Sequence, residues 1–171
     1  LRQLRGEALA CTTTGVVGER DSVSYVSPSA AYLAVEYWPA SALLDPAIDP
    51  FDWFDRHKGL RSTIIYRFPF AAGEPAGFAL FKGLPGTQFT FVERGSHLHA
   101  AMSGSGSGPD ADQELLLQSL HAGAFASNPE APAHARLDAR VPLDPAQLTF
   151  RFTDHGLLIG ADGAGHRGAR R

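Results

Sequence analysis

The sequence predicts an α+β domain: a mostly antiparallel sheet of five to seven strands, packed by an N-terminal helix and a second helix near residues 110–126. Two observations lead to this prediction. Short segments rich in β-branched and aromatic residues recur along the chain, separated by turns that contain Pro or Gly. Two other segments space their apolar residues as a helix does. Because 171 residues suffice for one core, we expect a single domain over residues 1–160.

The strands are predicted most clearly in the middle of the chain. Residues 60–70, 77–82 and 87–93 are joined by short turns, which favours a three-stranded antiparallel meander. Residues 22–26 alternate polar and apolar side chains, as a half-buried strand does. Further strands are expected at residues 30–37, 136–141, 147–152 and 157–159.

Helical spacing is found at two places. Leu1, Leu4 and Ala8 fall on one face of a predicted N-terminal helix. Residues 110–126 begin with acidic residues and continue with leucines that can share an inner face, which favours the second helix. Residues 30–37 would also suit a helix capped by the preceding Ser-Pro, although their β-branched and aromatic residues favour a strand.

Large apolar side chains on the inner faces of these elements form the expected core. Gly and Ser alternate over residues 103–108, which indicates a flexible linker, and residues 161–171 read as a flexible basic tail. The expected core residues are Ile64, Tyr66, Phe68, Phe78, Leu80, Phe89, Phe91, Leu116, Leu120, Phe150 and Phe152.

Composition excludes several classes of function. The formal net charge is −3, from 18 acidic and 15 basic residues, so nothing steers the chain toward nucleic acid. Cys11 is the single cysteine, which rules out an intramolecular disulfide and a cysteine-based zinc site. No apolar run reaches the roughly 18 residues of a membrane span. Because the chain starts with Leu1, we expect membrane attachment only through a segment upstream of it.

The segment from His97 to His99 is the best candidate for metal binding. In a strand these two imidazoles point to the same face, and together they can bind one divalent metal ion. A functional site needs a third ligand, for which Glu93, His57 and His121 are the nearest options. The alternative is a pair of exposed histidines that lead into a flexible loop. With a third ligand, the chain would be a small metal-assisted enzyme.

A second candidate surface combines aromatic and charged residues at positions 52–57. Trp and Arg often anchor protein interfaces, so Trp53 and Arg56 are candidate partner-binding residues. In the alternative interpretation, Trp53 and Phe54 simply cover the end of the sheet. We find no nucleophile elbow and no phosphate-binding loop in the sequence.

Both ends of the chain resemble the minor pseudopilins and minor type IV pilins. Residues 1–9, Leu-Arg-Gln-Leu-Arg-Gly-Glu-Ala-Leu, are similar to the second half of that family's long N-terminal helix. Residues 148–157 are similar to its C-terminal strand-turn-strand. The resemblance implies a location in the cell envelope or outside the cell and a helix face of Leu1, Leu4 and Ala8 that packs in a fibre. Without the resemblance, a cytoplasmic location is expected.

These observations favour a non-enzymatic structural or interaction module over an enzyme. We expect a protein partner or self-assembly, with a pilin-like subunit of a fibre or secretion assembly as one form of it. No cofactor and no nucleic acid are expected. The small metal-assisted enzyme that uses His97 and His99 is the alternative.

Overall fold

The structure is a computed structural model that describes residues 22–37, 61–105, 113–128, 131–143 and 149–160. Strands take up 69% of these residues, and their only helices are short 3-10 turns. The predicted α+β class is therefore wrong, because the described chain is mostly β. No helix within these ranges has the length and apolar character to cross a membrane.

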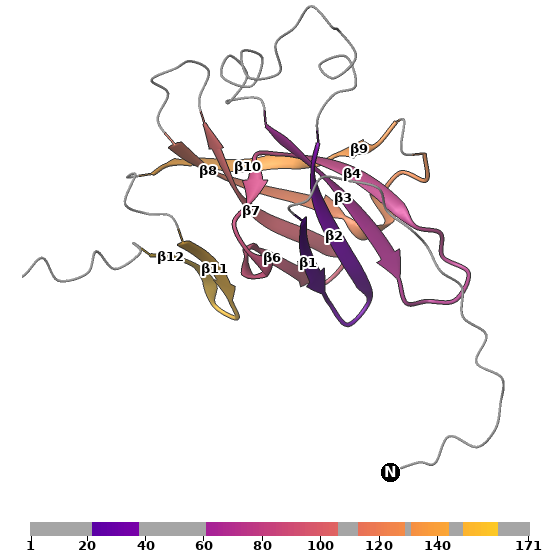
Figure 1. Cartoon of the computed structure of the whole chain (residues 1–171). Helices are drawn as coiled ribbons and strands as arrows, with labels where there is room; N and C mark the ends of the chain where they lie inside the picture. The colour runs from indigo at the N-terminus through magenta and orange to yellow at the C-terminus, as the bar shows by residue number, and fades with distance from the viewer. Residues whose placement is uncertain (1–21, 38–60, 106–112, 129–130, 144–148, 161–171) are drawn as a thin grey trace, which may run out of the picture.

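The first sheet, sheet A, has the strand order β1-β2-β3-β4-β9 (Figure 1). Its first four strands form an antiparallel meander, and the short β9 pairs with β4 in parallel. The strands expected in this part of the sequence are thus confirmed. Their bounds are β1 (Ser22–Val26), β2 (Ala30–Tyr37), β3 (Ser62–Pro69), β4 (Gly77–Lys82) and β9 (Ala133–His134).

The second sheet, sheet B, has the order β10-β8-β7-β5, and β6 also pairs with β7. Strands β5 and β6 follow one another along the same edge of β7. The short 3-10 turn η2 (Gln88–Thr90) lies between them in the chain. The strand bounds are β5 (Leu84–Pro85), β6 (Phe91–Arg94), β7 (His97–Ser105), β8 (Gln113–His121) and β10 (Arg136–Pro142).

The predicted second helix is instead strand β8. It pairs with β7 in antiparallel register along its whole length, and residues 103–105 of the predicted linker belong to β7. Leu116 faces sheet A whereas Leu115 faces away from it, and both side chains are buried. A strand that is buried on both faces reads as a continuous apolar run, which helical spacing also fits. The predicted N-terminal helix lies outside the described residues.

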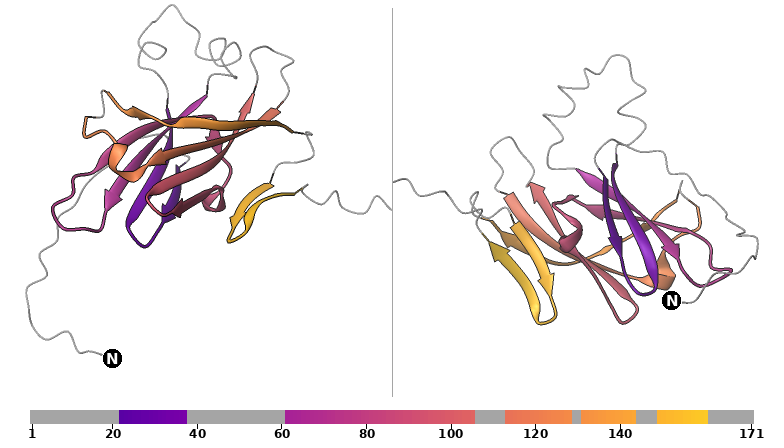
Figure 2. Two further views of the ribbon diagram at one scale, coloured as in Figure 1. Left: turned by 180° about the vertical axis from the view of Figure 1, so that it is seen from behind. Right: turned by 60° about the horizontal axis from the view of Figure 1, so that its bottom comes forward.

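Sheets A and B pack face to face around the main core (Figure 2). Ile65 and Phe81 come from sheet A, whereas Leu98 and Met102 come from sheet B, and all four are fully buried. Among the predicted core residues, Ile64, Phe91, Leu116 and Phe150 are buried and Tyr66, Phe68, Phe78, Leu80, Leu120 and Phe152 are partly exposed.

The last predicted core residue, Phe89, is 46% exposed. It belongs to η2, where the Thr87 side chain accepts a hydrogen bond from the Phe89 N–H and interrupts the expected alternation. The predicted third strand of the central meander is therefore shortened to β6. Strand β6 also pairs within sheet B and does not pair with β4.

The strands β11 (Thr149–Thr153) and β12 (Gly156–Gly160) form a hairpin that covers part of the outer face of sheet B. Phe150 packs there with Ala101, Leu115 and Leu143 in a second, smaller core. Figure 1 shows the hairpin to one side of the sandwich, near the end of β8 and β10. The predicted C-terminal hairpin is thus confirmed.

The chain passes from sheet A into sheet B at two points beside the end of β4. At one crossing, β9 continues through Ala135 into β10, and the Ala135 N–H donates to the Leu80 carbonyl at 3.0 Å. At the other, Gly83 joins β4 to β5 with a φ of 80°. The Gly83 N–H donates to the Arg61 carbonyl at 2.7 Å, and the Thr63 hydroxyl donates to the Gly83 carbonyl at 2.7 Å.

The crossing at Gly83 is also tied to sheet B through the buried Gln118. Its side-chain oxygen accepts the Lys82 N–H at 2.9 Å, and its side-chain nitrogen donates to the Lys82 carbonyl at 2.7 Å. Gln118 is 2% exposed, so these two bonds satisfy polar groups that water does not reach. They fix the point at which the chain leaves sheet A.

We predict that Gly83→Ala destabilises the domain more than Gly73→Ala does. Both glycines have a positive φ, at 80° and 85°, so an alanine at either position costs about 1–2 kcal/mol of backbone strain. A Cβ at Gly83 would in addition overlap the Ser103 carbonyl, whereas nothing lies within 4 Å at Gly73. The overlap should add about 1–3 kcal/mol. Urea unfolding of both variants measures the difference, and equal destabilisation would contradict this account of the crossing.

Candidate functional site

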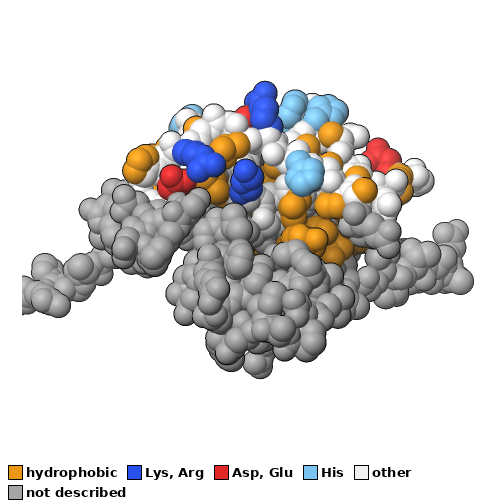
Figure 3. Space-filling view, turned by 90° about the horizontal axis from the view of Figure 1, so that it is seen from above, with side chains coloured by type: hydrophobic (Ala, Val, Ile, Leu, Met, Phe, Trp, Pro, Cys, Tyr) orange, Lys and Arg blue, Asp and Glu red, His pale blue; other side chains and the backbone are white. Residues whose placement is uncertain are grey.

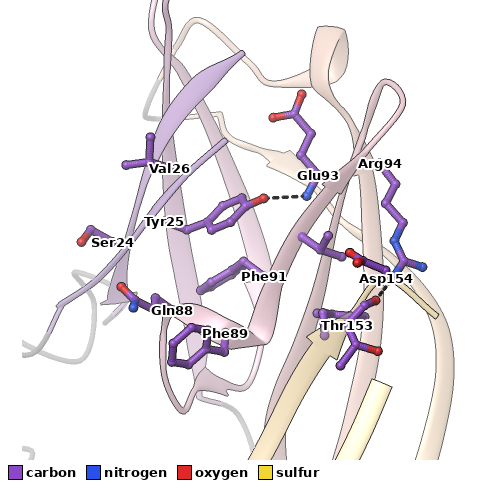
Figure 4. Close-up of a pocket in the computed structure, with 12 residues that line it drawn as sticks. Ser24, Tyr25, Val26, Gln88, Phe89, Phe91, Glu93, Arg94, Thr153 and Asp154 are labelled. Carbon is purple, nitrogen blue, oxygen red and sulfur yellow. Dashed lines mark hydrogen bonds between the residues drawn. The ribbon is translucent and has the colours of Figure 1, made fainter. Parts of the chain in front are cut away.

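Between β1 and β6 the sandwich is open. Within the described ranges no backbone pairing joins the two sheets here. Side chains span the gap instead: the ring of Tyr25 stacks on Phe91 with centroids 6.2 Å apart. The Tyr25 hydroxyl accepts the Glu93 N–H at 3.0 Å, as Figure 4 shows. We call this region, from β1 on one sheet to β5, η2 and β6 on the other, the open side.

A cleft of about 610 Å³ lies on the open side and reaches the turn of the β11–β12 hairpin. The rings of Tyr25, Phe91 and Phe89 lie one below another between β1 and that turn (Figure 4). The polar and charged groups lie around these rings, and Arg94 donates a hydrogen bond to the Thr153 carbonyl. The remaining lining residues are Ser24, Val26, Gln88, Val92, Glu93, Phe152 and Asp154.

A second cleft, of about 380 Å³, lies further along the open side between β1 and β5. Ser22 and Val23 line it from sheet A, and Leu84 and Pro85 line it from sheet B. The clefts therefore follow β1 over all five of its residues, Ser22–Val26. A binding surface of this form suits an elongated ligand better than a compact one.

The outer edge of β1, with which no described strand pairs, contributes backbone groups to the larger cleft. The Ser27 N–H donates to the Ala30 carbonyl at 3.0 Å, which makes these two residues a hydrogen-bonded pair. Such pairs alternate along antiparallel strands. With the observed register, the N–H and C=O groups of Ser24 and Val26 then point away from β2. They face the side on which another strand could add.

A hydrogen-bonded carboxylate, Glu93, joins the two sheets at the end of the open side. Its oxygens accept the Ser29 hydroxyl at 2.5 Å and the Tyr32 hydroxyl at 3.0 Å. Burial alone would raise the pKa of Glu93, but hydrogen bonds from Ser27, Ser29 and Tyr32 outweigh it and lower the pKa below its ordinary value. Glu93 is therefore ionised at neutral pH and links the β1–β2 turn to β6.

The same network leaves Tyr32 neutral. Burial raises the pKa of Tyr32 to about 12; the Arg67 hydrogen bond opposes this change, and the negative charge of Glu93 adds to it. Arg67 in turn lies 3.3 Å from the Glu74 carboxylate, and its Nε has no hydrogen-bond partner among the described residues. With Glu93 ionised and Tyr32 neutral, neither group is suited to exchange protons near pH 7, so the network is suited to hold the sheets together.

The predicted metal ligands lie elsewhere, on the outer face of sheet B. His97 and His99 point to the same face of β7, as expected, and His121 lies directly opposite His97 on β8. Glu93 is paired with Leu98, so its side chain is on the other face and is no candidate ligand. His57 lies outside the described residues. Metal binding at His97 and His99 stays a prediction.

Charged groups surround these histidines. Burial lowers the pKa of His99, and Asp138 opposes this change, whereas His97, Arg94 and Arg136 add to it. Figure 3 shows histidine side chains close to Lys and Arg side chains on one face of the molecule. Among the described residues, no three His, Cys, Asp or Glu side chains are gathered as a metal site.

The predicted partner-binding residues Leu1, Leu4, Trp53 and Arg56 lie outside the described residues, as does the tail. Sequence reasoning missed the cleft on the open side instead. The rings of Tyr25, Phe89 and Phe91 form its aromatic floor. Tyr25 meets Phe91, which lies 66 positions later in the chain, and no local pattern indicates this contact. Phe89 is the cleft residue that the sequence analysis singled out, but its alternation with Phe91 predicted a position in the core.

We predict that the stability of the domain falls between pH 10 and pH 12 in a way that depends on Tyr32. The folded protein holds the Tyr32 proton up to a pKa of about 12, whereas an unfolded tyrosine loses it near pH 10. The stabilisation is therefore complete below pH 10 and disappears as the pH rises through 12. The free energy of unfolding, measured with urea across this pH range, should change less with pH for Tyr32→Phe than for the control Tyr37→Phe. Equal slopes would refute the assignment.

Comparison with known proteins adds no relative to these observations. The open side and the outer face of sheet B, which carries His97, His99 and His121, are therefore the features from which a function can be inferred. No known protein family, curated protein or solved structure matches the chain.

Proposed function

We propose that this domain is a non-enzymatic interaction module that binds an extended segment of a partner protein on its open side. The observation that carries the proposal is the asymmetry of the sandwich. Backbone crossings join the two sheets at the end of β4, whereas β1, at the other edge of sheet A, is unpaired on its outer side by any described strand and has two clefts that follow it. A partner strand placed there would extend sheet A beyond β1.

The edge of β1 supplies the general part of such binding. Peptides that add a strand to a sheet edge gain main-chain hydrogen bonds, while pockets for alternate side chains provide selectivity. The outward N–H and C=O groups of Ser24 and Val26 are placed to form such main-chain hydrogen bonds. The Val26 side chain is 67% exposed, so it is accessible to a partner beside the strand.

The aromatic floor supplies the selective part. Phe89 is 46% exposed, and the guanidinium of Arg151 already lies over its ring, 4.6 Å from the centroid. Tyr25 and Phe91 are stacked behind it and held by the Glu93 N–H. Ordered aromatic side chains of this kind bind apolar or cationic side chains with little loss of conformational freedom.

The alternative, a metal-assisted enzyme that uses His97 and His99, is supported less well than the interaction module. His97 and His121 are exposed on the outer surface of a sheet, and neither lines one of the two clefts of the open side. A catalytic site normally places its reactive groups in a concave pocket. A pilin-like subunit is one form that this module could take, and the sequence resemblance at the two ends of the chain is what supports it.

The proposal predicts that Phe89→Ala weakens peptide binding, whereas Phe70→Ala does not. Peptides selected from a random display library against the wild-type domain would be titrated against both variants by fluorescence polarisation. Truncation of an interface anchor costs about 2 kcal/mol, so we expect a loss of roughly tenfold or more for Phe89→Ala. Phe70 is the matched control, because it is 57% exposed and lines neither of these two clefts.

Two outcomes would contradict the proposal. The selection could yield no peptide that binds the wild-type domain above background. Alternatively, the two variants could lose affinity equally, which would place the bound peptide away from the open side. Thermal unfolding of both variants checks that the fold is intact, and both substitutions are at exposed positions.

A further inference from the structure

We propose that His97, His99 and His121 bind a divalent transition-metal ion such as Zn²⁺ on the outer face of sheet B. This site goes beyond the interaction module proposed above, because it lies on a different face and needs no residue of the open side. Imidazole is a preferred ligand of zinc, copper and nickel. Three histidines with one open coordination position are an established zinc-binding set.

The backbone places these three side chains together. Alternation along β7 puts His97 and His99 on the same face, two residues apart. The register of β7 and β8 puts His121 directly opposite His97. Side chains at directly opposite positions have Cβ atoms about 5 Å apart. The arrangement therefore follows from the pairing of two long strands and not from the conformation of a loop.

The rings of His97 and His121 are already at a separation that one metal ion can bridge. Their centroids are 5.0 Å apart, and the rings meet edge to face at 86°. Two imidazoles bound tetrahedrally to one zinc ion, each at about 2.0–2.1 Å, have centroids separated by about 5 Å. The centroids of His97 and His99 are 6.2 Å apart, so His99 must turn inward to complete the set.

Binding requires side-chain rotation, which the exposure of the site permits. His97 and His121 are exposed and His99 is half-buried. The His121 Nδ1 now accepts the Gly123 N–H at 3.0 Å, so its proton is on Nε2 when the ring is neutral. The ring must therefore release this exposed hydrogen bond to offer a lone pair to the metal. The freed Gly123 N–H can then bond to water.

Nearby cations are already engaged by other groups. Arg136 donates to the Asp138 carboxylate at 2.7 Å, and Arg94 donates to the Thr153 carbonyl. Asp138 also lies close enough to His99 for its charge to act on the imidazole. Carboxylates beside a metal-binding histidine commonly orient the ring and strengthen its binding. Asp138 thus offsets one of the two nearby arginine charges, and Arg94 is directed to a backbone carbonyl.

Calorimetric titration of the tag-free chain with ZnCl₂ in chelator-free buffer tests the proposal. We expect saturable binding to the wild type and a loss of at least about tenfold in affinity for each of His97→Ala, His121→Ala and His99→Gln, since even residues that only support a metal ligand contribute that much. His134→Ala is the matched control, because His134 is exposed on β9 of sheet A. Its affinity should equal that of the wild type.

Two results would overturn the site: no measurable binding of zinc to the wild type, or binding that the three variants leave unchanged. Thermal unfolding without metal shows whether each variant folds. If one does not fold, the zinc-induced rise in Tm of the remaining variants decides, because a bound metal stabilises only a folded protein that retains the site. Loss of zinc binding with peptide binding intact separates this inference from the proposed function.

Discussion

The two hydrogen bonds between the Gln118 side chain and the Lys82 backbone determine how the rest of the molecule is arranged. They hold the end of β4 against sheet B at the point where Gly83 turns the chain from one sheet into the other. A buried amide that lost either bond would leave polar groups without partners, so the pairing admits little variation. The crossing at Ala135 also lies beside the end of β4, whereas β1, at the other edge of sheet A, has no such crossing among the described residues.

The open side has a different kind of stabilisation. Here the sheets are held by side chains: Tyr25 on Phe91, and Glu93 with Ser29 and Tyr32. Within the part of the chain that the structure describes, side-chain contacts leave the backbone edge of β1 unpaired, and an unpaired edge attracts another strand unless it is covered or charged. In β1 the residues at the outward positions are Ser and Val, with no charge among its five residues, Ser22–Val26. The features that leave the sandwich open thus also make this edge suitable for a partner.

Local patterns in the sequence predicted most strands but not the fold class. Strands β1 to β4 and the C-terminal hairpin have alternating or β-branched sequences, so their positions could be predicted. Residues 113–121 could not, because a strand buried on both faces and a helix give the same apolar run. His97 and His99 could be proposed as metal ligands because their spacing is local, whereas His121 was one of three options for a third ligand until the strand pairing placed it opposite His97. The cleft on the open side depends on contacts between distant segments, which no local pattern contains.

Amide hydrogen exchange on the domain, alone and with a selected peptide, shows whether a partner strand adds to the edge of β1. In the free domain the account predicts fast exchange at Ser24 and Val26 and slow exchange at Tyr25, whose N–H points toward β2. Peptide binding should then slow exchange at Ser24 and Val26. Slow exchange at both positions in the free domain would show that the edge is already covered. Peptide-dependent protection confined to another edge, such as β12, would show that the open side is not the binding surface.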